Sequence, residues 1–548
     1  MKRSSIIAMV VALVASPALA VSPESIELGR QLFEKNWSHG NPAITSDGLG
    51  PLFNANSCVA CHNQGGVGGA GDSRFNAKTI GIESINISGD RIESDDLIKS
   101  LVSTFHPGFV SPDGTLINTL SLSHHGGSPQ FQKARAALMA QVNSRFSTEG
   151  GSLDAAEVRQ AYATPILFSN KVDGRTITIR ARLFQRNTSP LYGIALIDKI
   201  DKRLIEEQVR IQKKHPEISG RPSTLPSGRY GRFGWRGNID SLLDFVDQAC
   251  AAEVGLETAR KVQPADPMNR SYRNTSTDIK DKQIIAMRDF IAALPLPTRE
   301  IPNDSHEREM AINGERVFES IGCAVCHVPN MGPAKGLYSD ILLHDMGYES
   351  MDLNHAEPYI TRITSTGSRV LTKRLVVPYY GPATNITTSG VSTEKSIASQ
   401  AHRQFKESNS GYAFNAPSGP AEKTITVTFN TERITDPESG TQTDINLSSG
   451  TRLRFVGRQR EDFFRAQLEY TNFNQEWRTP PLWGVRDSAP YMHDGRAENL
   501  LEAIVMHDGE AAGTRDRFLK LPLADRHALI AFLNTLAAPK NVPQFDAD

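Results

Sequence analysis

Two C-x-x-C-H pentapeptides are the part of this chain in which residue types and spacing point most directly to chemistry. The first contains Cys58, Cys61 and His62, and the second contains Cys323, Cys326 and His327. In such a pentapeptide both thiols can add to the vinyl groups of one porphyrin, and the histidine then binds the iron as its proximal ligand. The sequence therefore predicts two covalently bound c-type haems, one at each pentapeptide.

A C-x-x-C pair by itself has two other common uses. It can supply half of a zinc site, or it can act as a thioredoxin-like redox pair. A zinc site needs two further ligands nearby, and a redox pair does not need the histidine that follows. Because the complete pentapeptide occurs twice, haem attachment is the interpretation that accounts for all of these residues.

The N-terminal segment has the pattern of a secretory signal peptide over residues 1–20. Lys2 and Arg3 precede an apolar run over residues 6–15, and Ala18-Leu19-Ala20 offers a small-residue cleavage site. The apolar run is shorter than the roughly 18 residues that span a bilayer, and no later stretch reaches that length. We expect a soluble mature chain that begins at Val21 and resides in the periplasm, where c-type haem is assembled.

Composition limits the size and the partners of the protein. The chain has 548 residues, 39% of them hydrophobic, and a formal net charge of -1. That length predicts two or three domains with ordinary cores, and the balanced charge argues against a nucleic-acid partner. Four of the five cysteines lie in the pentapeptides, which leaves Cys250 alone and no disulfide framework. We interpret Cys250 as a small residue on a helical stretch over residues 242–256.

An internal repeat becomes visible when the two pentapeptides are aligned. Residues 26–34 resemble residues 311–319, and each stretch predicts a short amphipathic helix ahead of a pentapeptide. Apolar periodicity predicts a closing helix in each half, over residues 281–294 and 525–536, and prolines follow both. An opening helix, a pentapeptide and a closing helix form the minimal plan of a class I cytochrome c domain.

The predicted fold class is therefore mainly α, with two class I cytochrome c-like domains over residues 21–300 and 301–548. The 42 glycines and 31 prolines predict long loops around the cofactors. Alternation of threonine with apolar residues over 175–182 and 423–430 predicts small β insertions. The polar stretch within about 350–470 indicates a loop-rich insertion, which is either a substrate surface or a solvated excursion.

Several motif blocks resemble one family in a consistent order. They are residues 47–62 with the glycine-rich stretch 65–71, and then residues 186–193, 231–235, 338–347, 476–484 and 489–497. Together they resemble the di-haem oxidoreductases often labelled thiol oxidoreductases. The last block is also similar to the second domain of bacterial di-haem cytochrome c peroxidases. The stretch between residues 347 and 476 is far longer here than in that family, and this departure affects what the resemblance implies about the substrate surface more than what it implies about the haem chemistry.

The resemblance implies a peroxidase-like layout, with a reactive first haem and a second haem that relays electrons. It implies that Trp235 lies between the haems and carries electrons; packing on one porphyrin face is the alternative. The implied partners are peroxide or another small oxidant and a small redox donor or cytochrome, and family analogy adds a calcium ion between the domains. A haem-dependent oxygenase and a non-catalytic di-haem electron-transfer cytochrome are the other functions that fit the motifs.

The second haem has two candidate sixth ligands, Met506 and His507, on one predicted helix. They lie about 100° apart on that helix, so only one can face the iron. His507 shares the apolar face with Leu500 and Ile504, and it stands where the resembled peroxidase motif has its ligand. We therefore expect His327 and His507 to make the second haem six-coordinate.

The first haem has no comparable candidate. His106, His124 and His125 are near enough in sequence, but the last two precede glycines in what resembles an exposed loop. We expect an open iron there, as binding of peroxide or dioxygen requires. His344 and His493 are expected to support the second haem from outside its ligand shell, with His493 in a tight turn.

Overall fold

The computed structural model describes the chain in segments. These are residues 21–40, 48–87, 99–100, 102–106, 109–110, 119–121, 125–130, 132–134, 136–137, 166–172, 174–225, 229–264, 266, 276–350, 359–365, 375–376, 425–431, 442–448, 451–456, 462–468 and 475–542. The signal peptide predicted over residues 1–20, His124 and most of the 350–470 insertion lie outside them. None of the described helices is both long and apolar enough to cross a membrane.

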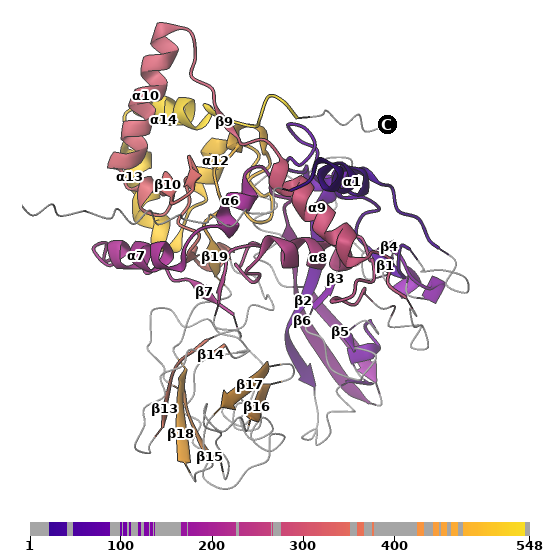
Figure 1. The fold of residues 1–548 in the computed structure, drawn as a ribbon. Helices are drawn as coiled ribbons and strands as arrows, with labels where there is room; N and C mark the ends of the chain where they lie inside the picture. Colours follow the sequence, from indigo (N-terminus) through magenta and orange to yellow (C-terminus); the bar gives the residue numbers. More distant parts are fainter. Residues whose placement is uncertain are drawn as a thin grey trace, which may run out of the picture.

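Each half of the protein contains a pair of packed helices. In the first half α1 (Pro23–Glu34) packs on α9 (Asp281–Ala293), and in the second α10 (Ser305–Ser320) packs on α14 (Leu523–Leu533). Figure 1 shows the two pairs on opposite sides of the upper part of the molecule. The opening and closing helices predicted from the sequence are thus confirmed.

The two helix pairs use the same contacts. A Cβ atom on Gly29 would overlap the Ala286 carbonyl of the facing helix, and one on Gly314 would overlap the Ala528 carbonyl. Only glycine lets the two backbones approach so closely. Beside each glycine two phenylalanine rings pack with centroids 5.3 Å apart, in the pairs Phe33–Phe290 and Phe318–Phe532. The repeat seen in the sequence is therefore a repeat of one packing arrangement.

The residues between α1 and α9 supply much of the first core, which also includes residues of the second half such as Trp483 and Ala538. Helices α6 (Ile194–Asp198), α7 (Lys202–Gln212) and α8 (Leu242–Ala252) follow one another along the chain. Cys250 is buried on α8 with its sulfur 3.9 Å from that of Met287 on α9. The interpretation of Cys250 as a packing residue is confirmed.

Two four-stranded antiparallel sheets are inserted into this helical plan. The first has the order β3-β2-β6-β5, with strands Thr119–Ser121, Ala77–Ile87, Arg175–Arg186 and Ile166–Val172. The second has the order β14-β13-β18-β15, with strands Leu375–Val376, Tyr359–Ser365, Asp462–Leu468 and Ile425–Thr431. A hairpin, β16 (Gln442–Ser448) with β17 (Thr451–Val456), also lies in the second insertion. The strands predicted over 175–182 and 423–430 are confirmed.

Most of the loop-rich insertion predicted within about 350–470 lies outside the described residues, and the parts of it that are described are strands. The structure corrects one loop assignment. His125 lies in the short strand β4 (His125–Gly126), which pairs with β1 (Leu52–Phe53), and is not in a free loop.

A short two-stranded sheet closes the base of the long insertion. Strand β12 (Leu343–Asp345) pairs with β19 (Glu476–Arg478), and His344 stands opposite Trp477. Residues on the two sides of the insertion are thereby hydrogen-bonded to each other. The insertion leaves and re-enters the helical part at one place, and so it interrupts the sequence without separating the two motif blocks in space.

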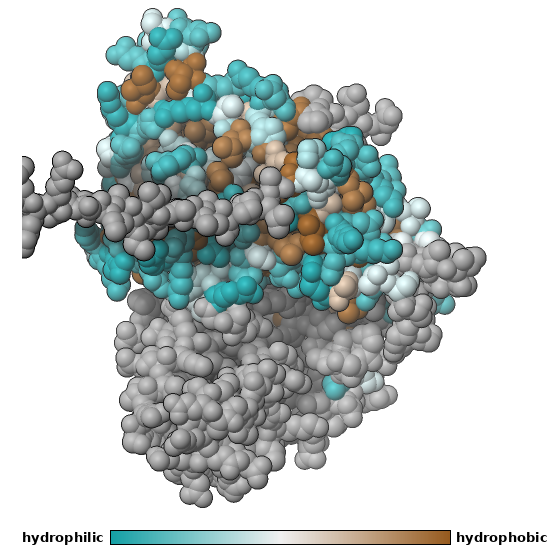
Figure 2. All heavy atoms as spheres, in the orientation of Figure 1, coloured by the Kyte–Doolittle hydropathy of each residue, from teal (hydrophilic) through white to brown (hydrophobic). Residues whose placement is uncertain are grey.

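The surface of the helical part is mixed in character. On the face drawn in Figure 2, small brown apolar groups are surrounded by teal polar residues. Exposed apolar side chains occur on several helices, with Leu28, Ile285 and Ile312 among them. Scattered apolar residues of this kind are normal on a folded surface.

Replacing Gly314 by alanine should destabilise the second half. The added methyl group would overlap the Ala528 carbonyl, and such overpacking costs about 1–3 kcal/mol in free energy of unfolding. Gly513→Ala is the matched control, because the nearest atom to its added Cβ, on the Arg517 side chain, is 3.6 Å away. That control should be neutral or stabilising by up to about 1 kcal/mol. Equal denaturation midpoints for the two variants would contradict the close helix contact.

Candidate haem sites and the residues between them

The first pentapeptide forms one turn of helix whose histidine is held by a glycine-rich loop. Helix α2 (Cys58–Cys61) begins at Ser57, whose hydroxyl accepts a hydrogen bond from the Ala60 amide at 3.2 Å. The next residue, His62, donates through Nδ1 to the Gly69 carbonyl at 3.0 Å. A carbonyl can only accept, so this bond fixes the tautomer whose Nε2 carries the lone pair.

The second pentapeptide repeats this arrangement. Its first three residues form the turn η3 (Cys323–Val325), and His327 donates through Nδ1 to the Tyr338 carbonyl at 2.9 Å. The neighbouring phenylalanine ring of the opening helix lies 6.2 Å, centroid to centroid, from the histidine ring in both halves, Phe33 from His62 and Phe318 from His327. Both histidines are therefore presented by the same local structure.

Burial keeps these side chains uncharged. It lowers the pKa of His62 and of His327 to about 4 and raises the pKa of Cys58 and of Cys323 to about 12. At neutral pH both imidazoles are neutral and both cysteines are thiols. A neutral imidazole with a free Nε2 is the form that binds iron.

His507 faces His327. Their ring centroids lie 6.3 Å apart with the planes at 58°, and His507 donates through Nδ1 to the Ala503 carbonyl at 2.7 Å. The structure corrects one detail, because helix α12 (Leu500–Val505) ends before Met506 and His507. His507 therefore follows the end of the helix, and its side chain turns back to the Ala503 carbonyl of that helix.

The geometry of this pair fits an iron between the rings. Two imidazoles on opposite sides of one metal ion have centroids about 6 Å apart, because each metal–nitrogen bond is about 2 Å long and each ring adds about 1 Å. Any angle between the planes is compatible, since each ring can turn about the common axis. With both Nδ1 atoms occupied by carbonyls, both Nε2 atoms remain for the iron. The residues present therefore fit a six-coordinate haem at the second pentapeptide.

Trp235 is hydrogen-bonded to one segment of each half. Its indole nitrogen donates to the Asn187 carbonyl at 2.9 Å, and its own carbonyl accepts from the Arg478 amide at 2.9 Å. The next residue after Asn187 is Thr188, whose carbonyl accepts from Gly71 in the loop that holds His62. On the other side, the carbonyl of Thr479 accepts from the hydroxyl of Ser339, which follows the residue that holds His327.

A second aromatic group adjoins Trp235. The His493 ring stacks on Trp477 with centroids 3.6 Å apart and planes at 17°, and its edge meets Trp235 at 6.5 Å. The Arg236 guanidinium lies 3.7 Å from the Trp477 centroid and so covers the opposite face. Burial, together with the charges of nearby arginines, lowers the pKa of His493 well below its ordinary value. The tight turn predicted at His493 is confirmed, with positive φ at Met492 and Gly495.

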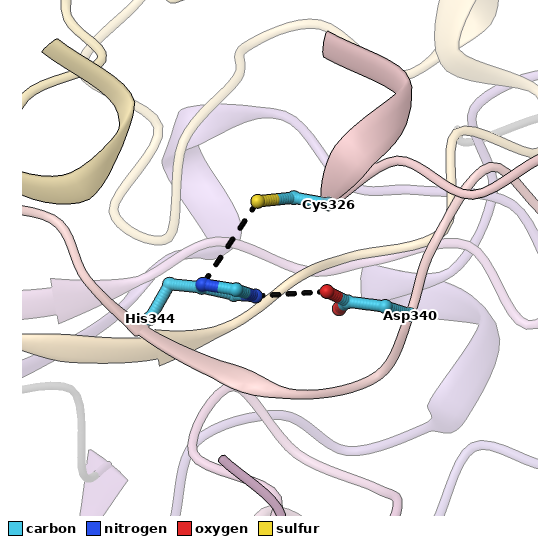
Figure 3. Close-up of side chains that lie close together, drawn as sticks. All are labelled: Cys326, Asp340 and His344. Carbon is cyan, nitrogen blue, oxygen red and sulfur yellow. Dashed lines mark hydrogen bonds and ion pairs between the residues drawn. The ribbon is translucent and has the colours of Figure 1, made fainter. Parts of the chain in front are cut away.

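His344 lies in a buried cluster beside the second pentapeptide. Figure 3 shows Cys326, Asp340 and His344 with their side chains directed toward one another. These three types can ligate a metal, and one ligand atom from each lies within 4.8 Å of the others. Both nitrogens of His344 are already bonded to carboxylates, at 2.8 Å to Asp340 and 2.8 Å to Glu510. The histidine therefore has no lone pair left for a metal ion.

The sequence did not single out several residues of these sites. Trp477 lies in a motif block, but nothing in the block indicates that a histidine will stack on it. Gln212 and Glu510 reach the cluster from α7 and from the turn after His507, and neither position carries a sequence signal. His106, named as a candidate ligand, is buried with its ring edge against Phe109.

The comparisons with known proteins bear on the C-terminal half. A family model described as "Di-haem oxidoreductase, putative peroxidase" matches residues 460–536, a segment that contains His493 and His507. The resemblance to the di-haem oxidoreductases is thereby confirmed. A search of curated proteins found no match.

One solved structure with some similarity is hydrazine synthase from Kuenenia stuttgartiensis. It shares 15% sequence identity with this chain, over 64% of this chain and 73% of that one, with a TM-score of 0.25.

Proposed function

We propose that the protein is a periplasmic di-haem c-type oxidoreductase of the peroxidase-like kind. The observation that carries the proposal is the His327–His507 pair, whose 6.3 Å separation fits one iron, in a chain with a second, structurally equivalent pentapeptide. The family match at residues 460–536 supports the same class. Each half would then be a class I cytochrome c domain, because the packed helix pair frames the pentapeptide in both.

The two sites are proposed to have different roles. Haem supplies redox chemistry and, where a coordination position is open, activation of a small oxidant. His327 and His507 would occupy both axial positions at the second site. At both sites a phenylalanine ring lies beside the histidine, but among the described residues no second imidazole ring faces His62 as His507 faces His327. This supports a reactive first haem and a relaying second haem, while the calcium ion implied by the resemblance stays a prediction.

Two other functions share the same sites. A haem-dependent oxygenase would use the open position for dioxygen, and an electron-transfer cytochrome would have no open position. The optical spectrum of the oxidised protein separates the carrier from the enzymes, because an open iron gives a high-spin haem. Turnover assays with peroxide and with dioxygen then separate the two enzymes. We favour the peroxidase-like function because of the matched family.

Replacing Cys58 or Cys323 by serine should remove one covalent haem each. Each thiol is one of the two anchors at its own pentapeptide, and no other pentapeptide exists in the sequence. The measurement is the pyridine haemochrome of the purified protein, expected to give two c-type haems per parent chain. Cys250→Ala, which changes the remaining cysteine, should keep both. A parent chain with any other haem count would end the proposal.

Replacing His507 by alanine should convert the second haem from six-coordinate to five-coordinate or water-ligated. Its reduction potential should rise, because a strong donor to the iron has been removed. Met506→Ala should change little, since that residue only ends helix α12. Electron paramagnetic resonance of the oxidised protein reports the ligand change. Loss of the low-spin signal in the Met506 variant alone would reverse the assignment.

Trp235→Phe tests whether this residue carries electrons. Phenylalanine retains most of the packing volume but is far harder to oxidise, so the variant should bind both haems and melt within a few degrees of the parent. We expect it to lose most peroxide turnover and the rapid phase of stopped-flow oxidation. The control is Trp37→Phe, at a buried tryptophan of the first core. This variant should keep both the peroxide turnover and the rapid phase of oxidation. Unchanged kinetics in the Trp235 variant would leave it a packing role only.

A further inference from the structure

The cluster at His344 includes Glu510 in addition to Cys326, Asp340 and His344, so it contains a second carboxylate. His344 Nε2 lies 2.8 Å from Asp340 Oδ2, and its Nδ1 lies 2.8 Å from Glu510 Oε2. Ionised carboxylates only accept hydrogen bonds, so both ring nitrogens must donate and the ring is an imidazolium. The side chains are 3%, 0% and 11% exposed for His344, Asp340 and Glu510. Two buried carboxylates thus share one buried cation, which leaves one negative charge uncompensated within the cluster.

Residues of the first half hold the two carboxylates in place. Gln212, at the end of α7, donates to Asp340 at 2.6 Å, and Ser219 donates to Glu510 through its amide at 2.9 Å and its hydroxyl at 2.6 Å. A Cβ atom on Gly220 would overlap the His344 ring, so the backbone passes directly over the imidazolium. Figure 1 shows α7 lying beneath the helices of the second half.

The cluster adjoins the second pentapeptide directly. Cys326 Sγ lies 3.9 Å from His344 Nδ1. Gln208 and Gln212 of α7 both donate to the Val325 carbonyl, at 3.3 and 3.0 Å, within the pentapeptide itself. Because these groups are buried, water and salt screen their charge weakly. An iron held by His327 would therefore experience the charge of the cluster.

We propose that the buried carboxylates of the Asp340–His344–Glu510 cluster lower the reduction potential of the second haem below the value it would have without their charge. The inference rests on the proposed function, since it requires a haem at Cys323 and Cys326. The oxidised iron carries one more positive charge than the reduced iron, so the negative charge of each nearby carboxylate stabilises the oxidised form. A lower potential adds to the effect of two imidazole ligands and makes the second haem a better electron donor. Asp340, His344 and Glu510 are positioning residues in this scheme, because they act through the haem environment.

Arg478 also lies near the cluster. It is buried on β19, and burial lowers its pKa to about 10 against the opposing effect of Asp340. It remains a cation at neutral pH, and its one positive charge balances the one uncompensated negative charge of the cluster. The direction of the prediction is unaffected, because removing either carboxylate makes the surroundings of the iron more positive.

The test is Glu510→Gln, which keeps the shape and removes one negative charge. The midpoint potential of the low-spin second haem should rise. At a fixed solution potential, the ratio of oxidised to reduced second haem should therefore fall roughly ten-fold. The potential of the first haem should not move. Redox titration followed by electron paramagnetic resonance assigns each midpoint to its own haem. Glu498→Gln, an exposed glutamate on the segment before α12, is the matched control and should leave both midpoints unchanged.

Asp340→Asn provides a second, independent variant with the same expected direction. Haem-loaded protein in which neither variant shifts the second midpoint would overturn the inference and leave the proposed function standing. A shift of equal size in the Glu498 variant would overturn it as well, because the effect would then not belong to the cluster. A parent chain with no covalent haem at the second pentapeptide, shown by the haemochrome, would overturn the proposed function and this inference together.

Discussion

The structure depends on one recurring interaction, the hydrogen bond from a histidine Nδ1 to a backbone carbonyl. His62, His327 and His507 each make it, to Gly69, Tyr338 and Ala503. The bond fixes the tautomer and aims Nε2, and it works only if the carbonyl is held rigidly. Much of the surrounding fold holds these carbonyls and rings in place. The glycine-rich loop positions Gly69, and the packed helix pairs place the phenylalanines against His62 and His327.

The two halves are alike in plan but are not independent units. Helix α7 belongs to the first half, yet its glutamines bond to the backbone of the second pentapeptide, and Ser219 bonds to Glu510. Trp235 is hydrogen-bonded to Asn187 of the first half and to Arg478 of the second. The second site is thus completed by residues that precede it by more than 100 positions. Duplication supplies two similar cofactor sites, and these contacts make them different.

Local patterns predicted the parts of the fold in which neighbouring residues decide the outcome. The opening and closing helices, the strands over 175–182 and 423–430, and the packing role of Cys250 follow from periodicity and residue type. The assignments that were wrong depend on distant partners. His125 forms a strand because Phe53 is available to pair with it, and helix α12 stops before His507 although the apolar pattern continues.

The sequence by itself predicted the chemistry of the two pentapeptides, because thiol, thiol and imidazole at that spacing are typical of a c-type haem attachment site. It also determined that the plan is duplicated. Tertiary structure alone decided what surrounds each site: the 6.3 Å distance from His327 to His507, the stacking of His493 on Trp477, and the carboxylates that hold His344. These contacts join residues far apart in the chain, so no local pattern encodes them. Ligand spacing is a local property, whereas burial and charge around a ligand are properties of the folded chain.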